Sequence, residues 1–425
     1  MVKELIVARW FGRSDALDAF LIAFLLPSFL LGLVMGGVES ALIPTFIRIR
    51  QAQGSEAAQK LFSSILLLSL LLLLATTVLL SLLAPLYLPY LGSGFSAAKL
   101  RLTRELLYAL LPFIVFSGIA TCASAVLNAG ERFALPALTP ILTPLVTILF
   151  VELGAGKWSA FTLAGGAVAG SALEATFLLR SLRAQGIHFS LRWHGLDPAT
   201  RSVIGQYAPM LAGAFLVGST SIVDQSMAAM LPAGSVAALS YAYKVISVIL
   251  ALGAAALGSA ALPYFSKMVA DNDWNGCRHT LKKYSLLIVA VAVPLTAGLM
   301  IFSKPLVRLL FQRGAFSPAD TELVGWVQIC YAIQIPFYIW ARLLIRFLSA
   351  IRRNDVLMYC SGINLVLDIV LNLILMRIWG VAGIALSTSL VYATIFLFLA
   401  LWSMRLLRQQ TLAVSVAAPV ERSVR

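Results

Sequence analysis

Three cations in this chain stand inside long apolar runs, where an ionisable side chain costs several kcal/mol and therefore indicates a function. Lys244 lies roughly three turns into the apolar stretch 235–266, which is long enough to cross a bilayer. Arg342 and Arg346 are four residues apart in a second apolar run, so they share one helix face. Guanidinium groups make bidentate contacts with phosphate. These residues predict a site for an anionic group; the alternative for Lys244 and Arg346 is that a long stem carries the charge to the membrane surface.

Acidic side chains in apolar runs are the complementary candidates. Asp18 opens the first long apolar run, Asp224 lies within a later one, and Glu39 stands among small residues where a helix can bend. Each could pair with a buried cation or carry a coupling proton or ion. We predict Asp18 for the substrate site and Asp224 and Glu39 for ion coupling. Asp368 and Glu174 also lie in apolar runs, where a hydrogen bond between helices explains them equally well.

Metal, cofactor and enzymatic chemistry lack their sequence signatures. The four cysteines have no CxxC spacing, and the three histidines lie in polar loops without a matching cysteine. The sequence has no P-loop, no nucleophile elbow and no HExxH motif. We therefore expect no metal, no cofactor, no catalytic residue and a protein that is not an enzyme.

The composition predicts a multi-pass helical membrane protein. Of 425 residues, 60% are hydrophobic and 12% are charged, and apolar runs of about 20 residues recur along the chain. The net charge of +14 comes from cations in the gaps between these runs, so we attribute it to membrane topology and expect no nucleic-acid partner. The predicted spans are 16–47, 61–91, 104–128, 133–152, 158–182, 203–231, 235–266, 283–303, 322–350, 355–378 and 380–404.

The distribution of lysine and arginine predicts the orientation. Alternate gaps, among them 48–60 and 267–283, hold 18 cations, whereas the other gaps, among them 304–321, hold 11. The side with 18 is predicted to be cytoplasmic, and the C-terminus lies on it. No cleavable signal peptide is expected, because the first 15 residues carry three cations and two acids without an apolar region.

The two halves of the chain repeat each other at a shift of 219 residues. Asp18 then lies over Ala237, and Ser40-Ala-Leu-Ile-Pro-Thr-Phe lies over Ser259-Ala-Ala-Leu-Pro-Tyr-Phe without a gap. The second half has six predicted spans and the first has five, so we expect that a helix before residue 1 is missing and that residues 6–12 are its exit loop. Six-span halves keep the same orientation, which predicts an all-α protein with two parallel pseudo-symmetric lobes around a central cavity.

The expected organisation follows from the repeat and from the polar segments. It is an N-terminal lobe 1–182, a basic cytoplasmic linker 183–202, a C-terminal lobe 203–404 and a polar cytoplasmic tail 405–425. Within the first lobe, the spacing of Gly166 and Gly170 is that of a GxxxG face, which predicts close packing of two helices.

Five motifs, spread over most of the chain, resemble those of one protein family. They are Ala8-Arg-Trp-Phe-Gly12 with Leu17-Asp-Ala-Phe20, Val126-Leu-Asn-Ala-Gly-Glu-Arg-Phe133, Gly234-Ser-Val-Ala-Ala-Leu-Ser-Tyr-Ala-Tyr-Lys244, Leu310-Phe-Gln-Arg-Gly-Ala-Phe316 and Gly380-Val-Ala-Gly-Ile-Ala-Leu-Ser387. The fourth is the most specific. These motifs are similar to those of the MviN/MurJ lipid II flippases, which belong to the multidrug/oligosaccharidyl-lipid/polysaccharide exporter superfamily.

The resemblance implies a two-lobed helical fold that moves an undecaprenyl-pyrophosphate-linked peptidoglycan precursor to the outer leaflet, with cavity cations on the pyrophosphate. Lys244 matches the basic residue of the family's eighth helix, and Lys3 falls where the family has an arginine. Asp18 and Asp224 match acidic positions, and Arg346 matches a frequent basic one. The chain departs from the family in three ways: it lacks the first helix, the basic doublet of the second helix and the two extra C-terminal helices.

We therefore predict a transporter that flips a polyprenyl-pyrophosphate-linked cell-wall precursor across the bacterial inner membrane by alternating access. The expected substrate-binding residues are Lys244, Arg342, Arg346, Asp18 and Lys3. Two alternatives stay open. One is an ion-coupled exporter of the same superfamily for another lipid or a drug, and the other is a degenerate relative that no longer transports. The expected partners are the anionic lipid-linked substrate and the bilayer, and the chain is expected to be a monomer.

Overall fold

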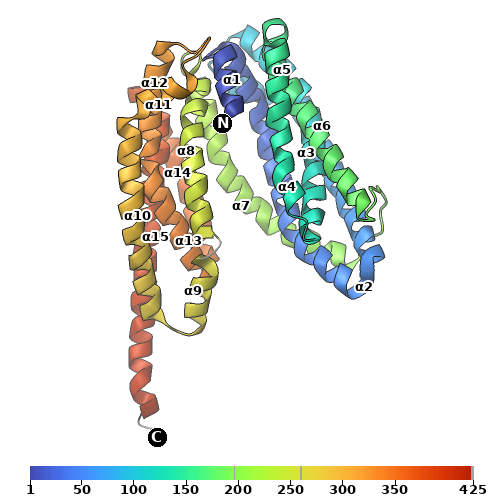
Figure 1. Ribbon diagram of the computed structural model, residues 1–425. Coiled ribbons are helices and arrows are strands. Elements are labelled where there is room, and N and C mark those ends of the chain that lie inside the picture. Colours follow the sequence, from blue (N-terminus) through green and yellow to red (C-terminus); the bar gives the residue numbers. More distant parts are fainter. Residues whose placement is uncertain (196, 259–260, 423–425) are drawn as a thin grey trace. The chain divides into compact units, whose positions relative to one another are not determined.

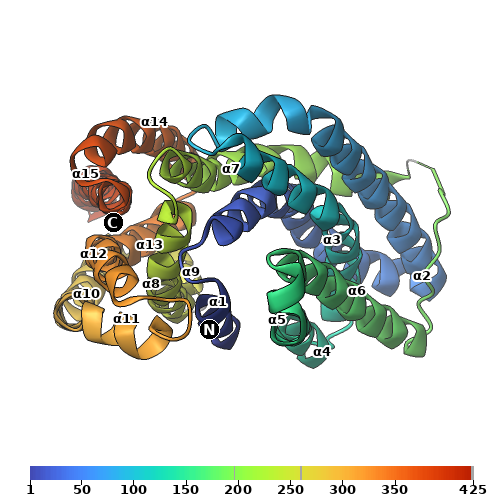
Figure 2. The same cartoon turned by 90° about the horizontal axis from the view of Figure 1, so that it is seen from above.

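The computed structural model describes residues 1–195, 197–258 and 261–422, and it leaves out the side chains of some helical residues within these ranges. The described residues are almost entirely helical and include no strand, as Figures 1 and 2 show. They form two compact units: unit 1 comprises Met1–Ala237 with Arg313–Ser317, and unit 2 comprises Ala238–Gln312 with Pro318–Arg425. Each unit is described by itself below.

Unit 1 contains the first seven α-helices and one short 3-10 helix, η1. They are α1 (Val2–Phe11), α2 (Asp15–Leu91), α3 (Ala97–Ala129), α4 (Ala134–Leu138), η1 (Thr139–Ile141), α5 (Leu142–Trp158), α6 (Phe161–Ala184) and α7 (Pro198–Ala229). The first residues of α8 (Ser235–Gly258) also belong to unit 1. The remainder of α8 continues into unit 2.

Unit 2 contains the rest of α8 and seven further helices. They are α9 (Ala261–Ala270), α10 (Trp274–Ile301), α11 (Ser303–Phe311), α12 (Pro318–Ala332), α13 (Gln334–Ala350), α14 (Asn354–Trp379) and α15 (Val381–Arg422). α15 continues beyond the predicted span 380–404, so the predicted tail 405–425 is helical up to Arg422.

α2 is a hairpin of two helical arms. Its 77 residues would extend over roughly 115 Å if straight, several times the thickness of a bilayer core. The helical geometry breaks at Gly54, which has a φ of 86°. Lys99, one turn into α3, contacts Asp15 at 2.6 Å, so the chain has returned to the end where α2 began. The two arms correspond to the predicted spans 16–47 and 61–91.

The gap 48–60 between the first two predicted spans is helical on both sides of Gly54. The flanking residues, RIRQAQ and SEAAQK, are mostly strong helix formers, which explains why the helix continues outside the apolar run. Only the glycine interrupts it.

The core of unit 1 lies between the two arms of α2 and α3. Phe46 and Phe62, one on each arm, are among its largest fully buried side chains. α3 contributes small residues to the same cluster, including Cys122, Ala123 and Ala125. Small side chains let helix backbones approach closely, as is usual between membrane helices.

Close packing of α5 and α6 confirms the predicted GxxxG face. A Cβ atom on Gly166 would lie 2.6 Å from the Cα of Thr147, and one on Gly170 would lie 2.5 Å from the Cα of Thr143. Both distances are far below van der Waals contact, so the two backbones meet where only glycine fits.

α11 was not predicted, since its residues fall in the gap 304–321. The helix is amphipathic: Val307 and Phe311, four residues apart, are buried, whereas Arg308 between them is exposed. An amphipathic helix of 9 residues is too short and too polar to be predicted as a membrane span. The gap therefore holds a helix as well as a loop.

The interpretation of residues 6–12 as an exit loop is also wrong, because α1 is helical from Val2 to Phe11. A shift of 219 residues places the end of α1 and the start of α2 within one residue of the end of α7 and the start of α8. This agreement supports the sequence repeat and makes α1 the counterpart of the last turns of α7.

Among the described residues, nine helices or helix pairs are long and apolar enough to cross a membrane. They are α2, α3, α4 with α5, α6, α8, α10, α12 with α13, α14 and α15. The difference from the eleven predicted spans arises at two places. α2 contains two of the predicted spans, and α7, which covers the predicted span 203–231, is not among the nine. The number eleven stays a prediction.

Packing assigns α7 to unit 1, although the sequence repeat places 203–231 in the predicted C-terminal lobe. Phe215 on α7 packs against Phe29 on α2 with ring centroids 5.9 Å apart. A Cβ on Gly94 would lie 2.4 Å from the carbonyl oxygen of Ala229, at the end of α7. The division by contacts therefore comes after Ala237, and the predicted lobes 1–182 and 203–404 stay a prediction about the repeat.

The loop between α6 and α7, predicted as a linker, is held against α2. The side-chain amide of Gln59 donates to the carbonyl oxygen of His188 at 2.7 Å, and its oxygen accepts from the His188 N–H at 2.9 Å. These two hydrogen bonds to the backbone of His188 hold the loop against α2 at this point.

Candidate functional site

Asp18 lies buried in the first turn of α2 and bonds the start of α8. Its carboxylate accepts the N–H of Gly234 at 2.7 Å and the N–H of Ala237 at 2.8 Å, and its side chain is shielded from solvent. The first N–H groups of a helix have no partner within the helix, and the helix dipole favours a negative charge there. Asp18 therefore caps α8 from another helix. Ala237 is also the residue that the repeat places over Asp18.

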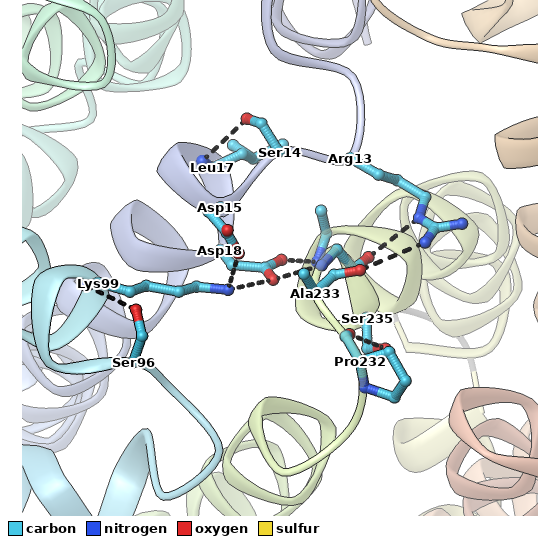
Figure 3. Close-up of polar contacts among 12 residues, drawn as sticks. Arg13, Ser14, Asp15, Leu17, Asp18, Ser96, Lys99, Pro232, Ala233 and Ser235 are labelled. Carbon is cyan, nitrogen blue, oxygen red and sulfur yellow. Dashed lines mark hydrogen bonds and ion pairs between the residues drawn. The ribbon is translucent and has the colours of Figure 1, made fainter.

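Lys99 supplies the countercharge of Asp18. Its ammonium group lies 2.8 Å from Asp18 and 2.6 Å from Asp15, and it sits 4.0 Å from the centroid of the Phe95 ring. Lys99 is only 8% exposed, although Asp15 is largely exposed. Figure 3 shows Asp18 between Lys99 on one side and the turn before α8 on the other.

Ser96 positions Lys99, because its hydroxyl accepts the N–H of Lys99 and caps the start of α3. Sequence reasoning missed Lys99 and counted it as a loop cation. The available signal was the serine cap, which places the lysine in the first turn of a helix rather than in a loop.

Arg13 holds the same turn from the other side. Its guanidinium donates to the carbonyl oxygens of Gly234 and Ala233 at 3.3 and 3.4 Å. Gly234 has a φ of 81°, and a Cβ there would lie 2.6 Å from the carbonyl oxygen of Arg13. Asp18 therefore bonds N–H groups of the segment 232–237, and Arg13 bonds carbonyl oxygens of the same segment. We call the set Arg13, Asp18, Lys99 and the turn 232–237 the clamp.

A second backbone contact in unit 1 joins the end of α1 to the segment Arg313–Ser317. The N–H of Ala315 donates to the carbonyl oxygen of Arg9 at 2.8 Å. A Cβ on Gly12 would lie 2.3 Å from the oxygen of Ala315, and a Cβ on Gly314 would lie 2.3 Å from the oxygen of Arg9. The two glycines have φ values of 52° and 59°. Gly12 thus leaves room for the carbonyl group of Ala315, and Gly314 leaves room for the carbonyl group of Arg9. We call this contact the glycine clasp.

The clamp is held by hydrogen bonds and an ion pair, and the glycine clasp by a hydrogen bond between main-chain atoms. Hydrogen bonds with a charged partner each contribute about 1.5–3 kcal/mol, so the two at Asp18 are substantial. A carboxylate released from Gly234 and Ala237 would keep Lys99 as its partner, so opening would not leave a buried charge alone. The arrangement suits reversible holding of a helix end rather than bond-making chemistry.

Two of the predicted cations of unit 2, Lys244 and Arg342, are exposed but are not together. Lys244 lies on the exposed surface of α8, roughly 10 Å further along the helix than Ala237. α8 meets α13 where Gly253 packs on Ile339, and both helices run in the same direction (Figure 1). Helical rise then separates Lys244 from Arg342 by roughly 18 Å along the axes.

Aromatic side chains lie beside Arg342 and next to Lys244 in the sequence. The Arg342 guanidinium stacks 4.9 Å from the centroid of Tyr338, and Arg346, one turn further along, is half-buried. Tyr243, beside Lys244, is 43% exposed and packs edge-on against Tyr331. Tyr241 is buried against Phe311, so only one of the two tyrosines beside Lys244 fits the membrane-surface alternative.

The other predicted site residues lie elsewhere. Lys3 is half-buried on α1 and pairs with Glu4 at 3.3 Å. Asp224 lies half-buried on α7, in unit 1. The backbone of Glu39 lies in α2, but its side chain lies outside the described residues. Among the described residues, no cluster of three or more histidine, cysteine or acidic side chains is arranged to hold a metal ion.

Comparison with known proteins places this arrangement in a family. A sequence model of the lipid II flippase MurJ matches residues 7–420. The chain belongs to the MurJ family. Probable MurJ flippases of Thermotoga maritima and Vibrio cholerae are 27% and 25% identical to it, cover 100% and 92% of the chain, and are themselves covered over 86% and 77% of their length.

Solved structures agree with this family. A lipid II flippase MurJ in an inward closed conformation has a TM-score of 0.81 and 25% identity, with 95% of this chain and 84% of that chain covered. An inward-facing multidrug transporter of the MATE family has a TM-score of 0.80 at 12% identity, over 96% and 95% of the two chains, and shows the fold alone. The prediction of an all-α multi-pass membrane transporter of the MurJ family is confirmed.

Replacing Lys99 with methionine tests the countercharge. We expect Lys99→Met to lower the free energy of unfolding by about 3 kcal/mol, because it leaves the buried Asp18 carboxylate without its cation. Lys99→Arg should restore part of this loss, since it keeps the charge. The measurement is thermal unfolding of the purified protein in detergent.

Arg101→Met on the same helix is the matched control. Arg101 is 77% exposed and pairs with the exposed Glu105, so its loss should cost less than about 1 kcal/mol. Equal effects of the two methionine variants would contradict the role given to Lys99.

Proposed function

We propose that this chain is a flippase that carries a polyprenyl-pyrophosphate-linked cell-wall precursor, lipid II or a close analogue, across the inner membrane by alternating access. The observation that carries the proposal is the family match from residue 7 to residue 420. Growth of a bacterium depleted of its own flippase, with and without this chain, is the direct test. Rescue together with loss of accumulated lipid II is the expected result, and a correctly inserted protein that fails to rescue would count against lipid II.

The exposed cations of unit 2 support a site for the pyrophosphate. Lys244 and Arg342 are both exposed on helices that are long and apolar enough to cross the membrane. Tyr338 holds the Arg342 guanidinium by its face and is itself packed against Tyr392, which leaves the N–H edges of the guanidinium for an anion. Since Lys244 and Arg342 are roughly 18 Å apart along the helix axes, we assign the pyrophosphate to Lys244 first and to Arg342 later in the passage. Arg346 and Lys3 stay further candidates.

The clamp supports a transport cycle in which α8 moves. Asp18 bonds main-chain atoms at the start of α8, and Lys244 lies on the same helix, so a force on Lys244 acts on the clamp through α8. We propose that the clamp forms in one state of the cycle and is released in another. The predicted role of Asp18 in binding substrate then becomes a role in holding the helix that carries Lys244.

An ion-coupled exporter is the second candidate, favoured by the similarity of the fold to a multidrug MATE transporter. Lys244→Ala separates the two. A pyrophosphate carrier should lose at least tenfold in rescue of the depleted strain, since each phosphate contact of a lysine is a charge-assisted hydrogen bond. An exporter coupled through Asp224 should tolerate Lys244→Ala and fail with Asp224→Asn.

Lys267→Ala is the matched control for Lys244→Ala. Lys267 is exposed on α9 in the same unit, and we give it no role in the passage. Lys244→Arg keeps the charge and should rescue in part. A protein that transports lipid II normally with alanine at 244 would sink the assignment.

The location follows from the family and the orientation from charge. We propose the bacterial inner membrane, with the C-terminal end of α15 in the cytoplasm, because gaps on that side hold 18 of the 32 cations. We also propose that the chain acts as a monomer.

A further inference from the structure

A pocket in unit 2 lies between α9 and α10, outside the regions discussed so far. It has a volume of ≈ 460 Å³ and is lined by Tyr264 on α9 and by His279, Thr280, Lys283, Tyr284, Leu286, Leu287 and Ala290 on α10. Figure 1 shows these two helices joined by a short turn at one end of the hairpin that they form. We propose that this pocket binds the phosphate of an anionic phospholipid of the surrounding bilayer.

The polar end of the pocket fits an anion. His279 and Lys283 are four residues apart on α10, so both project to the same face, and both are exposed. The lining residues include no carboxylate. The turn before α10 holds two acids, Asp271 and Asp273, which do not line the pocket; Asp273 is the helix cap and accepts the N–H of Gly276 at 2.7 Å.

Helix stability does not account for these basic residues. Arg278, His279, Lys282 and Lys283 all lie in the N-terminal half of α10, whereas the helix dipole favours cations at the other end. An external anion gives them a partner that the helix does not. Topology alone would place cations in this gap, but it would not place two basic side chains over one pocket.

The apolar end of the pocket fits a lipid rather than a free phosphate ion. Leu286 and Leu287 are 70% and 55% exposed, and the exposed apolar side chains continue along α10 with Val289, Val291 and Val293. α10 is long and apolar enough to cross the membrane, and only 17% of its most apolar segment is buried, which leaves an apolar face that suits acyl chains. Tyr264 and Tyr284, beside the basic residues, are the side-chain type that gathers at the membrane surface.

A pocket in unit 1 shows the contrast. It has a volume of ≈ 650 Å³ and includes Glu131 beside Arg132, so its charges balance and nothing selects an anion. The α9–α10 pocket combines basic groups, interfacial tyrosines and an apolar track in the order in which a phospholipid presents phosphate, glycerol and acyl chains. Its proposed ligand is distinct from the transported substrate.

Native mass spectrometry of the full chain with defined lipids tests the site. We expect the wild-type protein to retain phosphatidylglycerol in preference to phosphatidylcholine. Lys283→Gln should weaken phosphatidylglycerol retention about tenfold, the usual scale for one charge-assisted hydrogen bond, and His279→Gln together with Lys283→Gln should weaken it further.

Lys282→Gln is the control, because Lys282 is the adjacent exposed lysine on the same helix and does not line the pocket. It should retain phosphatidylglycerol as the wild type does. Equal losses in the two single variants would show diffuse attraction and overturn the proposal, as would equal retention of the two lipids. Displacement of the lipid by inorganic phosphate at equal concentration would assign the pocket to a free ion instead. Because the readout is lipid retention, failure here leaves the transport proposal untouched.

Discussion

Asp18→Asn is expected to abolish rescue of a flippase-depleted strain and to lower the unfolding temperature of the purified protein. One carboxylate oxygen of Asp18 accepts from Ala237, and the other accepts from Gly234 and Lys99. Asparagine keeps only one acceptor oxygen, so in either orientation its amide N–H₂ group faces at least one of these donors. Lys99 is then a buried cation whose one remaining acidic partner, Asp15, is largely exposed. Removing one member of a buried ion pair costs about 3–5 kcal/mol.

Asp15→Asn is the matched control for this variant. Asp15 contacts the same lysine at 2.6 Å, but its side chain is 62% exposed, so solvent replaces what it loses. We expect near-normal rescue and an unfolding free energy within about 1 kcal/mol of the wild type. If the two asparagine variants behave alike, the capping of α8 is not what makes Asp18 matter.

Gly12→Ala and Gly314→Ala are each expected to destabilise the glycine clasp and to reduce transport more than tenfold. A Cβ at position 12 would lie 2.3 Å from the carbonyl oxygen of Ala315, and a Cβ at position 314 would lie 2.3 Å from that of Arg9. A main-chain oxygen cannot rotate away as a side chain can. The positive φ values add about 1–3 kcal/mol of conformational strain for a residue with a side chain. Rescue of the depleted strain and thermal unfolding are the two measurements.

Gly380→Ala isolates the strain from the clash. Gly380 has φ 56° and ψ −134°, close to the φ 52° and ψ −133° of Gly12, but nothing lies within 4 Å of a Cβ at this position. It should therefore show the conformational cost alone. If Gly380→Ala is as damaging as Gly12→Ala, the contact with Ala315 contributes nothing beyond local backbone geometry.

The sequence predicted the membrane class and the family, and it singled out Asp18 as a functional residue, because each depends on local features; the substrate-binding role predicted for Asp18 stays a prediction. An acid at the start of an apolar run is visible without any knowledge of its partners. Lys99 was missed because its pairing with Asp18 spans 81 residues and exists only once α2 has folded back at Gly54. Until then its neighbours in the sequence identify it only as one more cation in a short gap.

The glycines of the family motifs show the same limit. Gly12 and Gly314 were recognised as parts of two separate motifs, and the resemblance gave no reason for either. The structure supplies one reason for both, since each glycine accommodates the carbonyl group beside the other. The boundary after Ala237 could not be predicted for a related reason: the repeat compares positions in the sequence, whereas the packing of Phe215 on Phe29 contributes to which unit α7 joins.

The bonds described from Asp18 and Arg13 to the turn before α8 all reach main-chain atoms, of Ala233, Gly234 and Ala237. In these bonds Asp18 and Arg13 do not contact the side chains of the turn. A substitution at Ala233 therefore needs no compensating change in Asp18 or Arg13, so long as glycine stays at 234, whereas Ser235 is constrained because its buried hydroxyl donates to the carbonyl oxygen of Pro232 at 2.6 Å. Over evolutionary time position 233 is thus free to change while the helix end that the turn begins stays in place.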